Sequence, residues 1–142
     1  MIQRLVGSEM CIRDSPSFDA NVHVGGPVEK NTLHYIHSLG NKIDNSIPIS
    51  DNLYWSGNFD TLKKLIKNKE VNATEIRFFV GYSGWSPGQL EHELSEKSWI
   101  VCNEDVKHLL DNNDKHMWRD FIKKMDKEYA IWSNMPEDPA LN

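Results

Sequence analysis

The sequence predicts an α+β domain with a largely antiparallel sheet. Three observations lead to this prediction. Strand-like segments come first and in a hairpin arrangement, and helical segments are interspersed later. Residues 81–94 then combine a strand end, a tight glycine turn and a helix start in one run. Regular alternation of strands and helices would instead predict a parallel sheet.

The first 15 residues are expected to be foreign to this domain. Residues 5–15, Leu-Val-Gly-Ser-Glu-Met-Cys-Ile-Arg-Asp-Ser, resemble the conceptual translation of a transposase sequencing adapter. A basic targeting peptide is the alternative, but the segment has no long apolar core and no small-residue cleavage pattern. We therefore expect a non-native leader at residues 1–15. The rest, residues 16–142, is expected to be a single partial domain that lacks its N-terminal strands.

Charge and cysteine content restrict the classes of protein that the chain can represent. Its 142 residues carry a net charge of −5, which does not suit a protein whose affinity depends on neutralising phosphates. Outside the leader Cys102 is the only cysteine, so we expect no internal disulfide and a reducing, cytoplasmic location. No apolar run approaches the roughly 20 residues that cross a bilayer, so we expect no membrane partner.

Short strands and a hairpin are predicted in the first part of the domain. Residues 22–24 form a strand that ends at Gly25-Gly26-Pro27, a strong turn signal. Residues 32–37 alternate between two faces and form a second strand. Residues 47–49 and 53–56 flank a short turn that contains Asp and Asn, which tolerate left-handed backbone, so this pair is predicted to be a hairpin.

A helix and a central strand are predicted next. Asn58 is a suitable N-cap for a helix that runs to about residue 68. Residues 75–82 form the most convincing strand, and apolar side chains on both of its faces favour a central position in the sheet. The buried stripe of the helix, at helical spacing, consists of Leu62, Leu65 and Ile66.

The glycine turn is followed by a second helix whose start is predicted by two rules. Ser86 and Gln89 have the spacing of a capping box, and Pro87 falls at the first helical position. Residues four apart share a face of a helix. We therefore expect Leu90 and Leu94 to face inward and Glu93 to face outward with Lys97.

A strand, two helices and a tail are predicted after the second helix. Residues 99–102 have strand composition, and Cys102 in them is expected to be a small buried hydrophobic residue. Asn103 is expected to cap a short helix, and Asp114 to start another. Residues 129–142 contain two prolines and are expected to form an extended tail.

The sequence shows no constellation of catalytic or metal-binding residues. His34 and His37 have the spacing of some metal sites, but residues three apart on a strand point to opposite faces. Cys102 has no cationic or helix-terminal setting that would make it reactive. We therefore predict no catalytic residue, no cofactor and no metal.

Two surfaces near the glycine turn remain open to more than one interpretation. Tyr82 and Trp85 either form a packing corner, which we favour, or an exposed recognition surface on a rigid loop. The helix start at residues 86–89 could hold a small anion. An enzyme built on that site would use His34 or Glu91 to move a proton.

A third candidate surface is basic. Lys63, Lys64 and Lys67, with Lys69 close by, gather on the predicted helix. A solvated helix face is the favoured interpretation, and weak nucleic-acid binding is the alternative.

Several motifs together resemble the bacterial YqgE/AlgH family. They are a Gly-Gly-Pro-Val motif, a histidine six residues after it, a Gly-Tyr-x-Gly-Trp-x-x-Gly-Gln-Leu-Glu-x-Glu motif and a later tryptophan. The signature residues that carry the resemblance are Gly25, Gly26, Pro27, His34, Gly81, Gly84, Gly88, Glu91 and Glu93.

The resemblance implies an α+β domain with a split, barrel-like sheet. It also implies a bacterial cytoplasmic protein with no assigned reaction, and some members of the family are described as regulators of alginate production. The leading expectation is therefore a non-enzymatic binding or regulatory protein, possible partners being an unknown protein or a small anionic ligand. Its expected binding surface consists of Tyr82, Trp85, Ser86 and Gln89.

Overall fold

The computed structural model describes residue 18, residues 20–111 and residues 117–125. The chain divides into two compact units, which are treated separately: residues 2–112, and residues 113–142 together with residue 1. All described strands lie in the larger unit. They are β1 (Val22–Val24), β2 (Val28–His37), β3 (Ile47–Ser50), β4 (Leu53–Trp55) and β5 (Ile76–Tyr82). Its helices are α1 (Phe59–Lys67), α2 (Gln89–Ser95) and α3 (Val106–Leu110).

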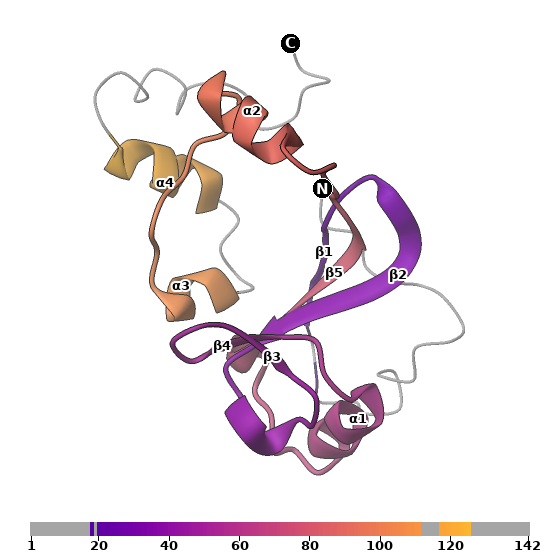
Figure 1. Cartoon of the computed structure of the whole chain (residues 1–142). Helices are drawn as coiled ribbons and strands as arrows, with labels where there is room; N and C mark the ends of the chain where they lie inside the picture. Colours follow the sequence, from indigo (N-terminus) through magenta and orange to yellow (C-terminus); the bar gives the residue numbers. More distant parts are fainter. Residues whose placement is uncertain (1–17, 19, 112–116, 126–142) are drawn as a thin grey trace. The chain divides into compact units, whose positions relative to one another are not determined.

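The strands form one open five-stranded sheet in the order β1-β5-β2-β4-β3 (Figure 1). Every pairing is antiparallel except that of β1 with β5. The α+β class and the largely antiparallel sheet are therefore confirmed. The central position of β5 is confirmed too, because β5 has a hydrogen-bonded neighbour on each side.

The core lies between one face of the sheet and α1. Tyr35, Ile76 and Phe78 of the sheet pack with Leu62 and Ile66 of α1, and all five side chains are buried. The Tyr35 hydroxyl donates a hydrogen bond to the carbonyl oxygen of Gly57 at 2.9 Å. Burial raises the pKa of Tyr35 to about 12, so the hydroxyl stays protonated and remains a donor.

The local signals in the first part of the chain are confirmed in detail. The side chain of Asn58 accepts hydrogen bonds from the backbone N–H groups of Asp60 and Thr61, at 3.0 and 3.1 Å, and so caps α1. β3 and β4 form the predicted hairpin, and Asn52 in its turn has a φ of +62°. Asn tolerates this left-handed backbone better than most residues do.

The second half of the larger unit differs from the sequence prediction. Residues 99–102 form no strand, and Cys102 is exposed instead of buried. α3 is capped by Asp105, whose side chain accepts from the N–H of Lys107, and not by Asn103. A strand needs a partner as well as suitable composition, and the described residues supply no partner for this segment.

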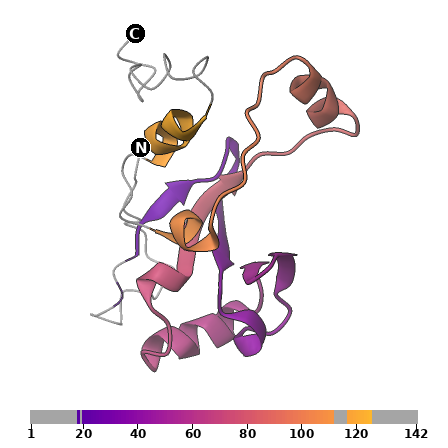
Figure 2. The same cartoon turned by 90° about the vertical axis from the view of Figure 1, so that its left-hand side faces the viewer.

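The start of α2 also differs from the prediction. The helix begins at Gln89, after Gly88 in the left-handed conformation, so Pro87 is not its first residue. The Ser86 side chain makes no cap, and α2 has no buried residue. The prediction that Leu94 faces inward is wrong, because this side chain is exposed. Figure 2 shows that the chain leaves the sheet after β5, forms α2 and then returns to α3.

The smaller unit is described only over α4 (Met117–Lys124) and Met125, with Ile122 buried. The predicted helix start at Asp114, the extended tail at residues 129–142 and the leader at residues 1–15 lie outside the described residues. No helix in the described ranges combines the length and the apolar character that a membrane crossing requires.

Candidate functional site

Two glycine motifs that are distant in the sequence meet at one point of the sheet. The N–H of Gly25 donates to the carbonyl oxygen of Val80 at 2.8 Å. A Cβ atom on Gly25 would collide with the carbonyl oxygen of Gly81, and one on Gly26 would collide with the backbone of Tyr82. The loop after β1 therefore packs against the end of β5 at a distance that only glycine allows.

Gly81 also sets the direction of Tyr82. Its φ of +68° lies in the left-handed region, which interrupts the alternation of side chains along β5. Tyr82 consequently meets the ring of His34 on β2, edge to face, with ring centroids 5.7 Å apart. His34 lies in turn against Trp55 of β4, with centroids 6.2 Å apart and ring planes 26° apart. We call Trp55, His34 and Tyr82 the aromatic row.

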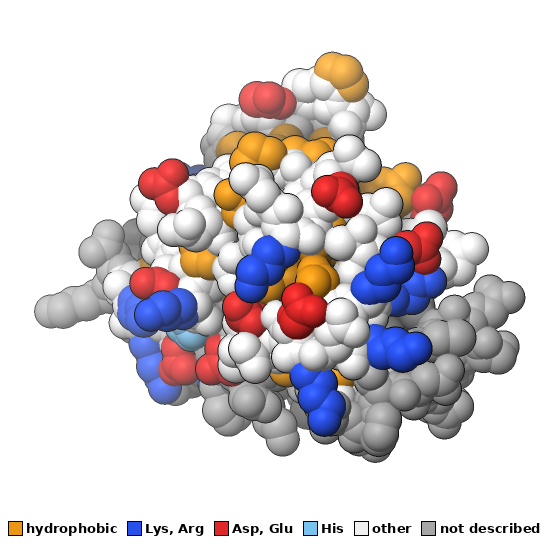
Figure 3. Space-filling model, turned by 90° about the horizontal axis from the view of Figure 1, so that it is seen from below, with side chains coloured by type: hydrophobic (Ala, Val, Ile, Leu, Met, Phe, Trp, Pro, Cys, Tyr) orange, Lys and Arg blue, Asp and Glu red, His pale blue; other side chains and the backbone are white. Residues whose placement is uncertain are grey.

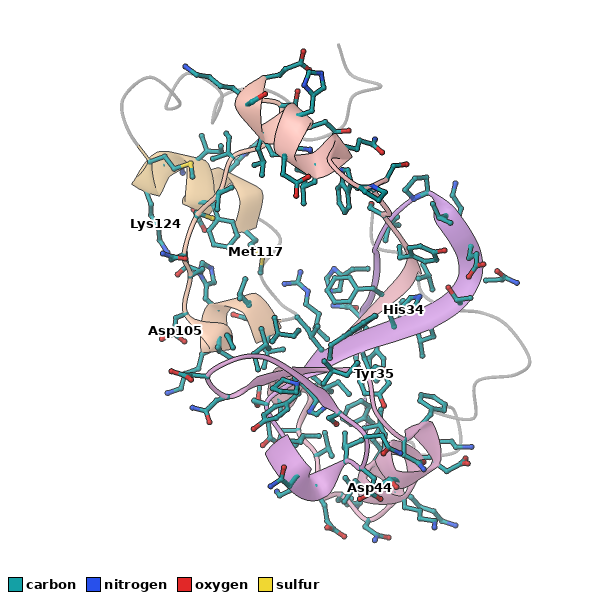
Figure 4. All side chains as sticks on the ribbon, viewed as in Figure 1. His34, Tyr35, Asp44, Asp105, Met117 and Lys124 are labelled. Atoms are coloured by element: carbon teal, nitrogen blue, oxygen red, sulfur yellow. The ribbon has the colours of Figure 1, made fainter. Side chains whose placement is uncertain are left out.

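The aromatic row is held in place by a hydrogen bond from β2. The Thr32 hydroxyl donates to the carbonyl oxygen of Glu29 at 2.8 Å and lies 3.0 Å from Nε2 of His34. Since the hydroxyl proton is already used, Nε2 of His34 is the donor in this contact. Figure 4 labels His34 on its strand, next to the core residue Tyr35.

The aromatic row lies on the face of the sheet opposite the core, and much of it is open to solvent. Trp55 is 42% exposed and Tyr82 is 38% exposed. Ile47 is paired directly with Trp55 across β3 and β4, and it is exposed as well. Contiguous exposed apolar surface of this kind marks interaction sites in many proteins.

A second aromatic group lies between β5 and α3, around α2. The indole N–H groups of Trp85 and Trp99 both donate to Oε2 of Glu93, at 3.0 and 2.6 Å. Nε2 of Gln89 donates to the other oxygen, Oε1, at 2.9 Å. The two indole rings meet edge to face with centroids 5.5 Å apart. We call Trp85, Gln89, Glu93 and Trp99 the indole clamp.

The hydrogen bonds of the indole clamp determine the charge of its carboxylate. They lower the pKa of Glu93, the bond from Trp99 having the largest effect, followed by those from Gln89 and Trp85. Each donor stabilises the charged form, so Glu93 stays ionised. The carboxylate of Glu93, which was predicted to face outward, lies on a helix with no buried residue and contacts the two indoles.

Comparison with known proteins identifies the family. The model of a family described as AlgH-like matches residues 2–130. The chain belongs to the AlgH-like family. A UPF0301 protein of Chlorobium limicola is 43% identical over 121 residues, which cover 85% of this chain and 65% of that protein. A UPF0301 protein of Bacteroides fragilis is 40% identical over 124 residues, which cover 87% of this chain and 63% of that protein.

Solved structures share the AlgH-like fold at lower identity. The solution structure of the AlgH protein from Pseudomonas aeruginosa has a TM-score of 0.60 at 22% identity, and covers 83% of this chain and 61% of its own. A crystal structure from Corynebacterium diphtheriae has a TM-score of 0.62 at 18% identity, with coverage of 80% and 60%. The chain thus spans less than two thirds of the length of these relatives.

The structure of this AlgH-like chain divides the predicted binding surface between the two aromatic groups. Tyr82 joins the aromatic row, and Trp85 and Gln89 join the indole clamp. The backbone N–H of Ser86 donates to Oε1 of Gln89 at 3.0 Å, so half of the predicted capping box is present. The structure adds Trp55, which the sequence analysis missed, and it gives a contact to Trp99, the later tryptophan of the family motifs. No local pattern in the sequence connects Trp55 with His34.

The remaining signature residues of the AlgH-like chain have different roles. Gly88 provides the left-handed residue before α2, and Gly84 lies in the loop against the Tyr82 ring. Pro27 is exposed in the loop between β1 and β2. Glu91 is exposed on α2, and no hydrogen bond joins it or His34 to Ser86 or Gln89 within the described residues.

Other ionisable groups of the AlgH-like domain stabilise the fold. His37 is fully buried: Leu39 N–H donates to its Nδ1 at 3.2 Å, and its Nε2 lies 3.0 Å from the carbonyl oxygen of Ser56. Burial lowers the pKa of His37. Arg77 donates to the carbonyl oxygen of Leu109 at 2.9 Å and so ties α3 to the sheet. In the part of the chain that the structure describes, no three His, Cys, Asp or Glu side chains gather as a metal site would require.

The lysine face of α1 is interrupted by acidic groups. Lys63 forms an ion pair with Asp60 at 2.6 Å, and this contact lowers the pKa of Asp60. Lys64 and Lys67 are exposed on the same helix. Figure 3 views the molecule from below Figure 1, where α1 lies, and it shows basic and acidic side chains interspersed.

Proposed function

We propose that this AlgH-like chain is a non-enzymatic binding domain that recognises a protein partner through its exposed aromatic surface. The observation that carries the proposal is the indole clamp. Because Glu93 takes both indole N–H groups, Trp85 and Trp99 present mainly their apolar edges and faces to solvent. Tryptophan and tyrosine that are fixed before binding lose little entropy on association and are frequent in binding hot spots.

The chemistry of the clamp supports binding rather than catalysis. A general base needs a pKa near the working pH. Glu93 accepts three hydrogen bonds that lower its pKa, and the Gln89 amide is bonded to both Ser86 and Glu93. The polar groups nearest the glycine turn are thus engaged with one another. A cytoplasmic location and a role in transcriptional regulation, exerted through the bound partner, are part of the same proposal.

Two alternatives have less support from the same surface. A small anion beside Gln89 would meet the ionised Glu93, whose Oε1 lies 2.9 Å from the Gln89 amide nitrogen, and like charges repel. Nucleic acid at Lys63, Lys64 and Lys67 would compete with Asp60 for Lys63. A protein partner at the aromatic surface would leave the Gln89–Glu93 hydrogen bond and the Lys63–Asp60 ion pair unchanged.

Site-specific photo-crosslinking tests the proposed surface. A benzophenone amino acid replaces Trp85 or Tyr82 in the full-length protein in bacterial cells, and the adducts are identified by mass spectrometry. We expect one protein to be captured from both positions. The matched control carries the same probe at Lys67, which is exposed on α1. The proposal is wrong if Lys67 captures the same proteins in the same yield, or if neither aromatic position captures any.

A further inference from the structure

The part of the chain between β5 and α3 carries most of the negative charge. Residues 83–105 contain five carboxylates and one lysine, a net charge of −4 with histidine neutral, against −5 for the whole chain. We call residues 83–105 the acidic segment. Its Glu91, Glu96 and Asp105 are exposed, and Figure 2 shows that α2 stands apart from the sheet. Charge of one sign gathered on one surface attracts and orients a partner of the opposite charge.

The indole rings of the clamp lie within the acidic segment and are open to solvent. Trp85 is 38% exposed and Trp99 is 48% exposed. The N–H group is the most positive part of an indole, and both N–H groups are bonded to the carboxylate of Glu93. The electron-rich ring faces are therefore what the clamp offers to a partner. The ionised carboxylate beside them strengthens their attraction for a cation.

The cations of the chain do not occupy these rings. Three lysine or arginine side chains lie over aromatic rings in the described part of the chain, and each of those rings is a phenylalanine. Neither Trp85 nor Trp99 has such a contact there, although tryptophan is the side chain that binds a cation best. The rings best suited to a cation are thus open to one from another molecule.

We infer that the protein partner places an arginine side chain against the indole rings of Trp85 and Trp99. This inference rests on the proposed function, because it names the chemistry of the partner at the same surface. A guanidinium group is planar and weakly hydrated, so it stacks flat on an aromatic face, whereas the lysine ammonium is compact and strongly hydrated. Arginine and tryptophan are also the residues most enriched in binding hot spots.

Peptide titration of the purified, ¹⁵N-labelled full chain tests the arginine site. The probe is a capped peptide of glycine and serine that carries three arginines. Two matched peptides carry lysine, which keeps the charge, or citrulline, which keeps the planar shape without the charge. The indole N–H signals report each tryptophan separately, and Trp85→Phe and Trp99→Phe assign them. Glu93→Gln and Glu91→Gln are the matched variants, since each removes one negative charge from α2 but only Glu93 holds the indoles.

We expect the arginine peptide to bind about tenfold more tightly than the citrulline peptide and about threefold more tightly than the lysine peptide. It should shift the signals of Trp85 and Trp99 more than those of the other tryptophans. Glu93→Gln should weaken its binding more than Glu91→Gln does. The inference fails if the lysine peptide binds as tightly as the arginine peptide, or if the two variants weaken binding equally. It also fails if no peptide shifts the two indole signals.

The titration needs no cellular partner, so its outcome is separate from that of the photo-crosslinking. A protein captured at Trp85, together with no preference for arginine, would overturn the arginine site and keep the proposed function. A clear preference for arginine with no captured protein would keep the arginine site and overturn the protein partner.

Discussion

At the scale of single residues, Glu93 illustrates how the signature acts. Its carboxylate collects three donors from Trp85, Gln89 and Trp99, which lie on both sides of it in the sequence. The sequence identified Glu93 as a signature residue and helical spacing placed it on the outward face of α2, but neither predicted its contact with the two indoles. Spacing cannot reveal that two indoles from flanking loops fold back onto one carboxylate.

Glu93→Gln is the sharpest test of the indole clamp. An amide keeps the shape of the side chain but replaces one acceptor oxygen with a donor, so at least one of the three donors loses its partner. We expect the near-ultraviolet circular dichroism of the coupled tryptophans to decrease while the unfolding midpoint of the sheet changes little. Glu91→Gln, on the exposed surface of the same helix, is the control and should leave the spectrum unchanged. Equal spectra for both variants would contradict the clamp.

His37 gives the fold a dependence on pH. Its Nδ1 accepts the N–H of Leu39, so protonation of the ring would break this bond inside the core. Burial holds the pKa of His37 below its ordinary value of 6.5 in the folded state. The unfolded chain therefore binds a proton more readily. The free energy of unfolding is at its full value above pH 6.5 and falls as the pH drops below it.

The measurement for His37 is a urea titration at pH 8 and at pH 5.5. We expect the midpoint of the wild-type chain to be lower at pH 5.5. His37→Asn cannot titrate, so its midpoint should be lower than wild type at pH 8 but should change less between the two values. An equal change in both chains would show that other groups carry the pH dependence.

At the scale of elements, the contact between the β1–β2 loop and the end of β5 is the most tightly fitted part of the sheet. Gly25→Ala places a methyl group on the carbonyl oxygen of Gly81, which is backbone and has little freedom to move. We expect this substitution to lower the free energy of unfolding by about 2 kcal/mol, as overpacking does. Gly84→Ala is the control, because its Cβ would be in ordinary contact with the Tyr82 ring at 3.6 Å. Chemical denaturation compares them, and equal loss would contradict the close fit.

The elements that the sequence predicted correctly are those whose signals are local. The cap at Asn58, the stripe at Leu62 and Ile66, and the turn at Asn52 each depend on neighbours within a few residues. Residues 99–102 have equally good strand composition, but a strand exists only with a partner, and no local pattern supplies one. Asn103 and Asp105 are both good caps, so composition alone could not choose between them.

At the scale of the whole molecule, the candidate site exists because strand pairing brings distant residues together. The aromatic row takes one ring each from β4, β2 and β5, which are separated by up to several tens of residues in the chain. Solved relatives keep this fold at 18% and 22% identity. A fold retained over so much sequence change carries little information about function, which depends on the particular side chains displayed on it.

The overall charge of the chain leads to a last prediction about nucleic acid. The chain carries −5, and on the side shown in Figure 3 acidic groups interrupt the basic ones. Lys63, Lys64 and Lys67 offer a local basic surface on α1, and Lys63 is paired with Asp60. Three phosphate contacts would give binding that falls with salt at a log–log slope of no more than about 3. We therefore expect no measurable retention of duplex DNA by fluorescence anisotropy at physiological salt, and no change when the three lysines become glutamine. Tight binding that these substitutions abolish would show that α1, and not the aromatic surface, is where this molecule meets its partner.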